Sequence, residues 1–409
     1  MNLIITRKCS NRCPYCFEVG ESTRSGSSQI SIANAERVAR WVALNGLDAL
    51  SLLGGEPFLH PELQAIVRVF RKICPKVSLT VFTGGYFDTA LLNNLDAADV
   101  SLLINVNEPM TYASPGRFDS VICNAVNAIR RGFRTTLGFN VWELGFSPEF
   151  MPNLAYNLGR QTFRWTVAHP ELDAACRVVG AVDFEPLATR CMLMLRKAVQ
   201  LGLRAHLDCP IPVCFFSDED LGWLAKYLPE TASRLGTCDV PLDISPDLEV
   251  MRCFALSGCD RVLLEDFSSP EDLKRHFQRS VDRNRWMPTL FKWCTDCTHA
   301  HSGRCRGGCL ARNGCIASTI DLPERMFGLI AKHGHAEALL AYRTAPPVLR
   351  SPLAGYLAAG AAIVLRDFDA AFRYAARALD TTEDAELKAR VQKLLAEVPA
   401  PQSTPSLEA

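Results

Sequence analysis

Short apolar runs alternate with stretches of helical periodicity along the first part of the chain. The apolar runs predict six strands, at residues 3–6, 49–53, 77–82, 100–106, 135–141 and 163–167. Apolar positions at helical spacing predict helices between them, at residues 30–44, 61–73, 87–95, 117–131 and 148–159. Strands that alternate with helices form parallel sheets with right-handed crossovers. Six such units are fewer than the eight that close a (β/α)8 barrel, so the pattern predicts an α/β fold with a partial, open (β/α)6 barrel.

Regular periodicity fades further along the chain, and cysteines become frequent. We expect residues 1–180 to form the partial barrel and residues 181–235 to form a bridging segment that completes it. Residues 236–320 are predicted to form a cysteine-rich domain, and this domain contains a small hairpin with its turn at Pro246-Asp247.

The chain becomes rich in alanine and leucine at helical spacing from residue 321 onward. Ser351 and Pro352 are predicted to be the N-cap and the first position of a helix. The expected elements are a helix at 353–365, a turn at 367–369, and helices at 370–379 and 383–397. Residues 321–397 thus loosely resemble a tetratricopeptide-type (TPR-like) α-helical hairpin, with a helical cap over the cysteine-rich domain as the alternative. Residues 398–409, rich in Pro and Ser, are predicted to be a disordered tail.

The charge balance narrows the class of protein. Lys and Arg together number 44, as do Asp and Glu, so the formal net charge is zero. Such a balance gives no indication of a nucleic-acid groove or a membrane-surface patch. No apolar run approaches the roughly 20 residues that span a bilayer, and the N-terminus lacks the pattern of a secretory signal. We therefore expect a cytoplasmic protein with no nucleic acid and no membrane among its partners.

Cysteine is frequent, with 17 residues in 409. Cysteines of cytosolic proteins are metal ligands or buried thiols far more often than disulfides. Eleven of the 17 fall in two groups, at residues 9–16 and 238–315, which indicates metal binding. Four others lie in or beside apolar segments and are predicted to be buried small hydrophobes: Cys74, Cys123, Cys176 and Cys191.

The first group, Cys9, Cys13 and Cys16, has the spacing C-x3-C-x2-C directly after the first strand. Three thiolates on one tight loop can hold three irons of a [4Fe-4S] cluster and leave the fourth iron open to another ligand. The spacing alone also allows a zinc knuckle that lacks its fourth ligand, or part of a disulfide framework.

Polar residues follow several other strands, at the edge of the barrel where such folds carry their chemistry. Residues 54–57, Gly-Gly-Glu-Pro, follow the second strand. Two glycines permit close backbone approach to a ligand, and Glu56 can accept hydrogen bonds from an ammonium group. Thr-Gly-Gly at 83–85 ends the third strand. Arg164 is the one charge in the sixth strand and points either into the barrel or out to solvent.

The cysteine loop and the Gly-Gly-Glu-Pro turn together resemble the radical S-adenosylmethionine (radical SAM) superfamily, whose signature is C-x3-C-x-aromatic-C after the first barrel strand. The resemblance implies that Cys9, Cys13 and Cys16 ligate a [4Fe-4S] cluster, that SAM chelates the open iron, and that Tyr15 lies near the adenine. It also implies that the turn at 54–57 contacts the methionyl amino group. The expected SAM-binding residues are Tyr15, Gly54, Gly55, Glu56, Pro57, Asn105, Asn107, Asn140 and Arg164.

The second cysteine group is too dense to be explained by core packing. Its layout resembles the SPASM domain, a cysteine-rich extension of radical SAM enzymes that modify peptides and proteins. The pattern runs C-x9–15-G-x4-C, then C-x2-C-x5-C-x3-C, then a last cysteine. By this resemblance the ligands of an inner auxiliary cluster include Cys238, Cys253 and Cys309. Those of an outer cluster are Cys294, Cys297, Cys305 and Cys315. Zinc sites completed by His299 or His301 are the alternative.

The chain departs from the SPASM pattern in several places. Leu248 stands where the pattern has glycine, the C-x5-C spacing is C-x7-C, and the last cysteine follows after only five residues. The fourth ligand of the inner cluster is missing from its usual place before Cys238. Cys209 or Cys214 is a candidate to supply it; otherwise the inner cluster has an open iron that could bind substrate.

These resemblances imply a radical SAM/SPASM oxidoreductase that acts as a peptide maturase. Reductive cleavage of SAM would give a 5′-deoxyadenosyl radical, and this radical would abstract a hydrogen from a peptide or protein substrate. A flavodoxin or ferredoxin would donate electrons, and one or two auxiliary [4Fe-4S] clusters would assist. The alternatives are a radical SAM dehydrogenase acting on a small molecule and a non-enzymatic metal-binding protein that recruits partners.

One residue, Phe254, reduces the number of expected types of peptide modification. In the sulfatase-maturing branch an acidic residue follows the counterpart of Cys253, and here Phe254 does, which disfavours oxidation to formylglycine. A cross-link and an epimerisation are the other outcomes. Epimerisation needs a hydrogen donor, and the candidate donors are Cys209, Cys214 and Cys259.

Overall fold

The computed structural model describes residues 1–11, 13–16, 26–168, 184–282, 294, 296–311, 322–344 and 350–398. The chain divides into two compact units, Met1–Arg312 and Asn313–Ala409. The barrel segment and residues 236–312 of the expected cysteine-rich segment therefore share the first unit, whereas residues 313–320 fall in the second. The finer boundaries within the first unit stay predictions. Within the described residues no helix is long and apolar enough to cross a membrane.

The first unit is built on one ten-stranded sheet with the order β10-β9-β8-β1-β2-β3-β4-β5-β6-β7. Every pair of neighbouring strands among β1 to β8 is parallel. The antiparallel pairs are β8 with β9 and β9 with β10. The strands are β1 Asn2–Thr6, β2 Ala49–Gly54, β3 Ser78–Thr83, β4 Ser101–Asn105, β5 Thr135–Val141, β6 Thr162–Val167, β7 Arg204–Leu207, β8 Asp243–Ile244, β9 Glu249–Met251 and β10 Arg261–Leu263. The six predicted strands are confirmed as β1 to β6, and β7 is a further parallel strand.

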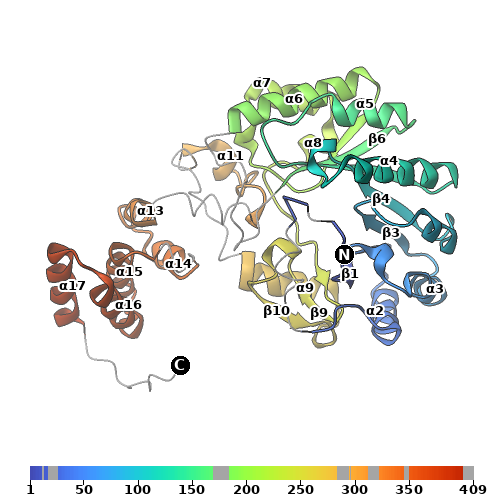
Figure 1. The fold of residues 1–409 in the computed structure, drawn as a ribbon. Coiled ribbons are helices and arrows are strands. Elements are labelled where there is room, and N and C mark those ends of the chain that lie inside the picture. The colour runs from blue at the N-terminus through green and yellow to red at the C-terminus, as the bar shows by residue number, and fades with distance from the viewer. Residues whose placement is uncertain are drawn as a thin grey trace. The chain divides into compact units, whose positions relative to one another are not determined.

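Helices follow the parallel strands and cover the outer face of the sheet (Figure 1). They are α2 Ile32–Leu44, α3 Leu63–Ile73, α4 Pro115–Arg130, α5 Phe150–Asn157 and α6 Phe184–Gln200. The helix expected at 87–95 is a short 3-10 helix, Thr89–Asn94. Later helices of this unit are α7 Asp218–Tyr227, α8 Pro229–Ala232, α9 Pro270–Phe277 and α11 Thr298–His301. The partial (β/α)6 barrel predicted from the apolar pattern is thus confirmed.

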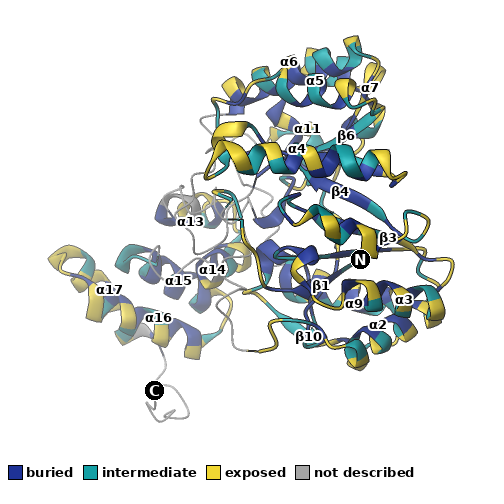
Figure 2. Ribbon diagram, turned by 45° about the vertical axis from the view of Figure 1, so that its right-hand side comes forward, coloured by how far each residue is buried: buried dark blue, intermediate teal, exposed yellow. Residues whose placement is uncertain are grey.

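Helices α2 to α6 have a buried side and an exposed side, as Figure 2 shows. In α3 the buried residues are Leu63, Ile66, Val67 and Phe70, at the spacing of a single helical face. Of the cysteines predicted to be buried, Cys74 and Cys191 are buried, whereas the prediction for Cys123 is wrong. The reason is that α4 buries Val121, Asn124, Ala125 and Ala128, and Cys123 lies outside that face. Cys176 lies outside the described residues.

The sheet curls around a concave face. Side chains stand roughly perpendicular to a sheet, and β3 and β6 are three strand spacings apart, about 14 Å in a flat sheet. Nevertheless, the guanidinium carbon of Arg164 on β6 lies only 5.1 Å from the ring centroid of Phe82 on β3. The two side chains can meet only across the hollow of a curved sheet. Arg164 therefore points into the barrel.

The predicted hairpin at Pro246-Asp247 is confirmed as the β8–β9 pair, and it extends the barrel sheet. Strand β8 pairs with β1, with Asn2 opposite Asp243. The backbone of Leu248 lies in the left-handed region, with φ of 65°. A left-handed residue costs roughly 1–2 kcal/mol unless it is glycine. Leu248 stands where the expected SPASM pattern has glycine, which takes this backbone without that cost, and burial of the Leu248 side chain offsets the cost here.

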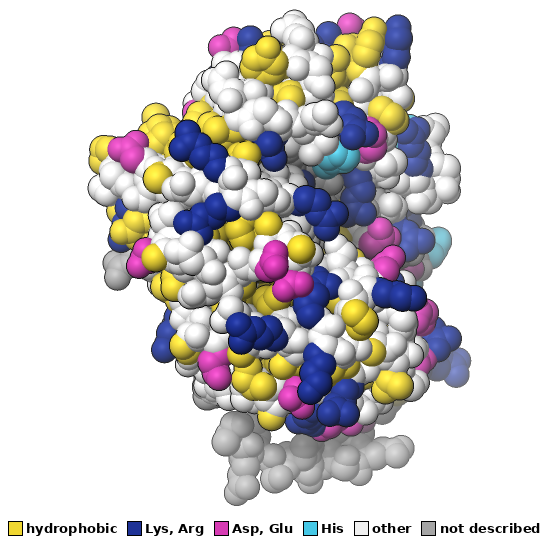
Figure 3. Space-filling view, turned by 90° about the vertical axis from the view of Figure 1, so that its right-hand side faces the viewer, with side chains coloured by type: hydrophobic (Ala, Val, Ile, Leu, Met, Phe, Trp, Pro, Cys, Tyr) yellow, Lys and Arg dark blue, Asp and Glu magenta, His cyan; other side chains and the backbone are white. Residues whose placement is uncertain are grey.

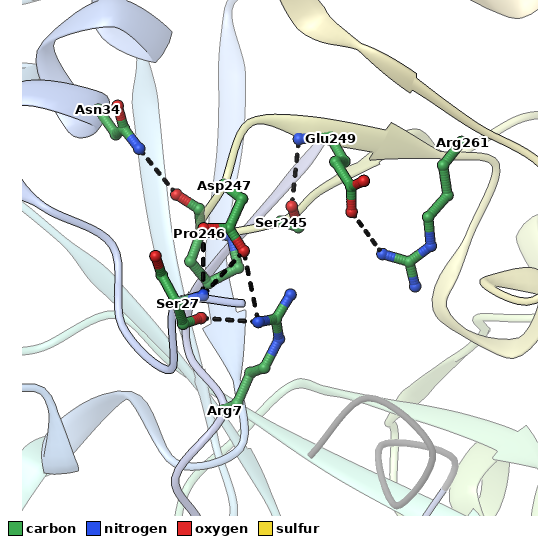
Figure 4. Close-up of polar contacts among 8 residues, drawn as sticks. All are labelled: Arg7, Ser27, Asn34, Ser245, Pro246, Asp247, Glu249 and Arg261. Atoms are coloured by element: carbon green, nitrogen blue, oxygen red, sulfur yellow. Dashed lines mark hydrogen bonds and ion pairs between the residues drawn. The ribbon is translucent and has the colours of Figure 1, made fainter. Parts of the chain in front are cut away.

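The turn of the hairpin is hydrogen-bonded to the segment that follows the cysteine loop (Figure 4). The backbone N–H of Ser27 donates to both carboxylate oxygens of Asp247, at 3.1 and 3.0 Å. Arg7 Nη1 donates to the Ser27 carbonyl at 2.7 Å and lies 3.5 Å from Asp247 Oδ2. Asn34 Nδ2 donates to the Pro246 carbonyl at 3.0 Å. The hairpin is thus fixed to both ends of the loop region between β1 and α2.

The second unit consists of helices α13 Leu322–Ile330, α14 His335–Thr344, α15 Pro352–Val364, α16 Phe368–Thr381 and α17 Ala385–Glu397. The Ser351 N-cap is confirmed, because its side chain accepts from the N–H of Ala354. The start expected for the next helix, residue 370, is two residues late. Asp367 caps that helix by accepting from Ala370 N, and the helix begins at Phe368. Residues 399–409 of the expected tail lie outside the described part.

Small residues let α15 and α16 approach closely. A Cβ built on Gly355 of α15 would lie 3.1 Å from the Cβ of Ala378 on α16. The α-helical character predicted for this region is confirmed, and its likeness to a TPR hairpin stays a prediction.

Charged side chains of both signs lie scattered among uncharged ones on the face of the molecule shown in Figure 3. This distribution matches the equal numbers of basic and acidic residues in the sequence.

Replacing Asp247 by alanine should lower the free energy of unfolding of the first unit by about 1–2 kcal/mol, because the Ser27 N–H and the Arg7 guanidinium lose a charged acceptor. The Arg7 side chain is only 5% exposed, whereas Asp247 is 32% exposed, which limits the effect. Urea unfolding followed by tryptophan fluorescence measures it, since all six tryptophans lie in residues 1–312. The matched control is Glu249→Ala, which removes a 41%-exposed partner of Arg261 and should cost about 0.5 kcal/mol. Equal effects of the two substitutions would contradict this account of the hairpin.

Candidate functional site

The cysteine loop leaves the carboxyl end of β1 and carries three thiols. Cys9 is exposed, whereas Cys13 and Cys16 are partly buried. A turn brings Cys13 and Cys16 together, because Cys16 N donates to the Cys13 carbonyl at 3.1 Å. The N–H of Asn11 donates to Cys9 Sγ at 3.4 Å, a contact that favours a thiolate. Burial raises the pKa of the Cys13 thiol, with the Tyr15 side chain opposing that shift. A bound cation would be needed to keep this thiol ionised.

The Gly-Gly-Glu-Pro turn at the end of β2 holds this loop by its backbone. Gly55 N donates to the Thr6 carbonyl and Glu56 N donates to the Lys8 carbonyl, both at 2.8 Å. A Cβ on Gly54 would lie 2.1 Å from the Thr6 oxygen, and a Cβ on Gly55 would lie 2.3 Å from the Lys8 oxygen. Only glycine fits either position. In the described structure the two glycines approach the cysteine loop itself, and their expected contact with SAM stays a prediction.

The carboxylate of Glu56 is fully buried and joins the ends of β2 and β3. It accepts from Thr83 Oγ1 at 2.7 Å, from Gly84 N at 3.0 Å and from Phe58 N at 3.3 Å. A Cβ on Gly84 would lie 2.6 Å from the amide nitrogen of Asn11, so the cysteine loop covers this point. Burial raises the pKa of Glu56 to about 7, although the three hydrogen bonds oppose the shift. The Thr-Gly-Gly turn after β3 therefore serves first to hold Glu56.

Tyr15 reaches across from the cysteine loop to the ends of β4 and β5. Its hydroxyl donates to Asn107 Oδ1 at 2.9 Å, and Asn107 Nδ2 donates to the Asn140 carbonyl at 2.8 Å. Tyr112 Oη accepts from Asn107 N at 3.0 Å. Burial raises the pKa of Tyr15 well above its usual value, so the hydroxyl stays neutral and can donate. Three residues predicted from different strand ends are thus brought together.

The remaining predicted residues line the concave face without joining this network. Asn105 ends β4 beside Gly138 of β5, where a Cβ would lie 2.4 Å from Asn105 Oδ1. Arg164 forms an ion pair with Asp208 at the end of β7. Asp208 was not predicted from the sequence, because only the pairing of β6 with β7 places it beside Arg164. Roles for Asn105 and Arg164 in SAM binding stay predictions.

A second group of thiols gathers around a backbone junction of three segments. Gly236 N donates to the Ile211 carbonyl at 2.8 Å, and the Gly236 carbonyl accepts from Arg306 N at 2.7 Å and Gly308 N at 2.9 Å. A Cβ on Gly308 would lie 2.6 Å from the carbonyl carbon of Ile211. The segments that contain Cys209, Cys238 and Cys309 are therefore joined at this point.

The hairpin brings a fourth thiol to the same place. The buried Arg252, next to Cys253, donates from Nη1 to Cys238 Sγ at 3.4 Å and also pairs with Asp282. Burial raises the pKa of Cys209 well above its usual value, and the charges of Asp208, Cys309, Cys238 and Cys253 raise it further. Burial likewise raises the pKa values of Cys238 and Cys253, while the Arg252 guanidinium lowers them. Arg252 was missed from sequence, although an arginine directly before a predicted ligand cysteine was a visible signal.

The predicted outer ligands lie on a separate short segment. Cys297 N donates to the Cys294 carbonyl at 3.3 Å, and Cys305 N donates to the His299 carbonyl at 2.9 Å. Gly307 N donates to Cys305 Sγ at 3.4 Å. Cys315 lies outside the described residues, so the outer set is only partly seen. In the part of the chain that is described, no three Cys, His, Asp or Glu side chains are arranged to hold a single metal ion.

The other candidates lie apart or are occupied by packing. Cys214 and Cys259 are both exposed. Phe254 is buried in a cluster with Ile4 and Met251, and its N–H donates to Asp243 Oδ2 at 2.6 Å. The position that is acidic in the sulfatase-maturing branch is therefore used for core packing here.

The pH dependence of stability should report the burial of Glu56. Its folded pKa of about 7 lies above the ordinary 4.5, so the folded state holds its proton more tightly. The contribution of protonated Glu56 to the free energy of unfolding is fully present below pH 4.5 and is lost as the pH rises through 7. Relative to the wild type, Glu56→Gln should gain about 3 kcal/mol in free energy of unfolding between pH 4 and pH 8, as urea titrations at several pH values would show. The exposed control Glu62→Gln should follow the wild type; a similar gain there would contradict the assignment to Glu56.

Comparison with known proteins agrees with this geometry. The sequence model of the Radical SAM superfamily matches residues 3–137. The human molybdenum cofactor biosynthesis protein 1 is 26% identical over 151 residues, which are 36% of this chain and 22% of that protein. The GTP 3′,8-cyclase of Yersinia pestis is 34% identical over 86 residues, which are 21% of this chain and 26% of that protein. The matched segments thus span about a quarter of these relatives or less.

Two solved structures share the fold. Streptococcus suis SuiB bound to S-adenosylmethionine matches with a TM-score of 0.50 and 15% identity, over 67% of this chain and 65% of that one. The anSMEcpe structure with bound AdoMet matches with a TM-score of 0.54 and 16% identity, over 75% of this chain and 89% of that one. The cysteine loop and its Gly-Gly-Glu-Pro turn both lie within residues 3–137, the segment of this chain that matches the Radical SAM superfamily.

Proposed function

We propose that the chain is a radical SAM enzyme that modifies a peptide or protein, with auxiliary iron–sulfur clusters in its cysteine-rich segment. A [4Fe-4S] cluster on Cys9, Cys13 and Cys16 would supply the electron that cleaves SAM to methionine and a 5′-deoxyadenosyl radical able to abstract a hydrogen atom. An electron donor such as a flavodoxin or ferredoxin would reduce this cluster. The expected products are a side-chain cross-link, an epimerised residue or an oxidised residue.

The observation that carries the proposal is the attachment of the three-thiol loop to the Gly-Gly-Glu-Pro turn. Two backbone hydrogen bonds and two obligatory glycines hold the thiols over the carboxyl ends of the parallel strands. Three soft thiolates on one loop suit an iron–sulfur cluster with one open iron. The polar groups beside it are neutral donors and acceptors of Tyr15, Asn107 and Asn140, which suit a polar nucleoside-containing cofactor.

The residues of the concave face would bind and orient the substrate. Phe82 and Arg164 lie together in this hollow, an apolar ring beside a cation. The ion pair with Asp208 holds the Arg164 guanidinium in one orientation toward a bound substrate.

A peptide substrate is supported by the SPASM-like layout of the second cysteine group. Three thiols of that group converge with Cys209 in the first unit, and the hairpin turn takes the left-handed backbone that the SPASM glycine provides. Formylglycine formation is disfavoured, since Phe254 is packed in the core where a base would be needed. Among the candidate hydrogen donors for epimerisation, Cys214 and Cys259 are the exposed ones.

A small-molecule substrate is the second candidate, and one finding favours it. The relatives found by sequence include proteins named GTP 3′,8-cyclase, at up to 34% identity over short segments. Those matches cover at most 36% of this chain, as in the molybdenum cofactor biosynthesis protein. These matches therefore support a likeness of the matched segment only, and the substrate of the whole chain is decided by experiment.

Anaerobic reconstitution with iron and sulfide tests the cofactor assignment. The full chain should bind about 12 irons if it holds three [4Fe-4S] clusters. With a reductant and SAM it should release 5′-deoxyadenosine, and Cys13→Ala should abolish that release because the SAM-binding cluster loses a ligand. Binding of zinc in place of iron, or no cleavage of SAM, would overturn the proposed enzyme.

Co-expression with short open reading frames encoded beside the gene tests the substrate class. Mass spectrometry of the peptides should show a mass change with the wild-type chain and none with Cys13→Ala. A change that persists in Cys13→Ala would exclude radical chemistry as its cause. Turnover of GTP or another small molecule by the reconstituted enzyme, without any change in the peptides, would favour the second candidate.

A further inference from the structure

Four thiols meet where the two ends of the curved sheet come together. Strand β7 is the last strand at one end of the sheet order, and Cys209 follows it by two residues. The hairpin strands lie toward the other end, with Cys238 before β8 and Cys253 directly after β9 and Arg252. Cys309 completes the group from the glycine-rich segment. Thiols from four separate places in the sequence thus share one region of the first unit.

Backbone contacts fix this convergence independently of any ligand. The Ile211 carbonyl, two residues after Cys209, is bonded to Gly236, two residues before Cys238. Gly236 in turn accepts from Gly308, the residue before Cys309. Gly236 and Gly308 both have positive φ, of 88° and 76°, and a Cβ on either would collide with a neighbouring backbone atom at 2.5–2.6 Å. The chain is therefore shaped to bring the three cysteine segments into contact.

A buried cation accompanies the four thiols. Arg252 is 1% exposed and donates to both Cys238 Sγ and the Cys238 carbonyl, each at 3.4 Å. A buried arginine is costly unless negative charge lies beside it. If the thiols were neutral, Asp282 would be the negative charge that compensates the Arg252 guanidinium. Thiolates that bind a metal would add negative charge beside it. The donor set and its counter-charge both fit a cysteine-ligated metal centre.

We propose that Cys209 is the fourth protein ligand of the inner auxiliary cluster, together with Cys238, Cys253 and Cys309. The assignment rests on the proposed function, which supplies the iron–sulfur centre. It leaves no open iron in that cluster, so the cluster carries electrons and the substrate binds elsewhere. It also gives the cluster a structural task, because its ligands join β7 to the β8–β9 hairpin across the opening of the barrel.

Cys214 provides a matched control five residues away. It is exposed on the 3-10 helix Val213–Phe215, beyond the Ile211–Gly236 bond that anchors Cys209. The test uses the full chain with Cys9, Cys13 and Cys16 replaced by alanine, so that only auxiliary centres remain. Cys209→Ala or Cys214→Ala is then added, and each protein is reconstituted anaerobically with iron and sulfide. Iron content, Mössbauer spectra and electron paramagnetic resonance are measured.

The background chain should hold about eight irons if both auxiliary clusters form. Cys209→Ala should lose between one and four of these, with a three-iron signal or a missing cluster, and should match Cys238→Ala. Cys214→Ala should keep the full iron content and the unchanged spectra. If Cys209→Ala keeps all its iron and an unchanged spectrum while Cys238→Ala loses iron, the assignment is overturned.

Two measurements separate this inference from misfolding and from the proposed function. In the otherwise wild-type chain, Cys209→Ala should keep the spectral change that SAM produces in the first cluster, which shows that the barrel is folded. If Cys209→Ala loses that change while Cys238→Ala keeps it, the iron loss in Cys209→Ala comes from unfolding and the ligand role is overturned. If the background chain binds zinc and Cys209→Ala halves the bound zinc or more, the ligand assignment stands and the proposed iron–sulfur enzyme fails.

Discussion

Strand β1 is hydrogen-bonded on both sides, and the whole first unit depends on that arrangement. On one side it pairs with β2, whose Gly-Gly-Glu-Pro turn holds the cysteine loop. On the other side it pairs with β8, which begins the hairpin between Cys238 and Cys253. A single five-residue strand thus positions the SAM-type thiol loop and the cysteine-rich segment relative to each other. A shift of register along β1 would displace both sets of thiols at once.

Buried carboxyl groups lie in the segments on either side of this strand. Glu56 links the ends of β2 and β3. Asp243 of β8 accepts from Asn2 Nδ2 and from Phe254 N, both at 2.6 Å. Burial raises the pKa of Asp243 to about 6, as it raises that of Glu56. On burial each carboxyl group loses its bound water and accepts instead from N–H or O–H groups of the protein. Polar groups that are buried and fully bonded in this way specify one strand arrangement over others.

The sequence predicted the elements that repeat a simple pattern, and it failed where tertiary pairing decides the structure. Strands β1 to β6 each contain buried apolar residues and read as short apolar runs. Strand β7, Arg-Ala-His-Leu, was missed because its alternate residues face the concave side and are polar. The start of α16 was misplaced because Asp367 reads as a turn residue and serves as a cap. For the site, the motif positions were predictable from spacing. The Asp208 partner of Arg164 was not, and neither was the choice of Cys209 over Cys214, since both depend on contacts between segments far apart in sequence.

The two thiol sites differ in the same way, in how far apart their residues lie in the sequence. The thiols of the first loop lie within eight residues, so short-range turns can bring them together and their spacing is visible in the sequence. The second site draws on residues 209 to 309, and its geometry exists only after the curved sheet has formed. Closing so long a loop costs chain entropy that a metal bond could offset. A metal centre that joins the ends of the sheet would therefore stabilise the open barrel, in addition to any electron it carries.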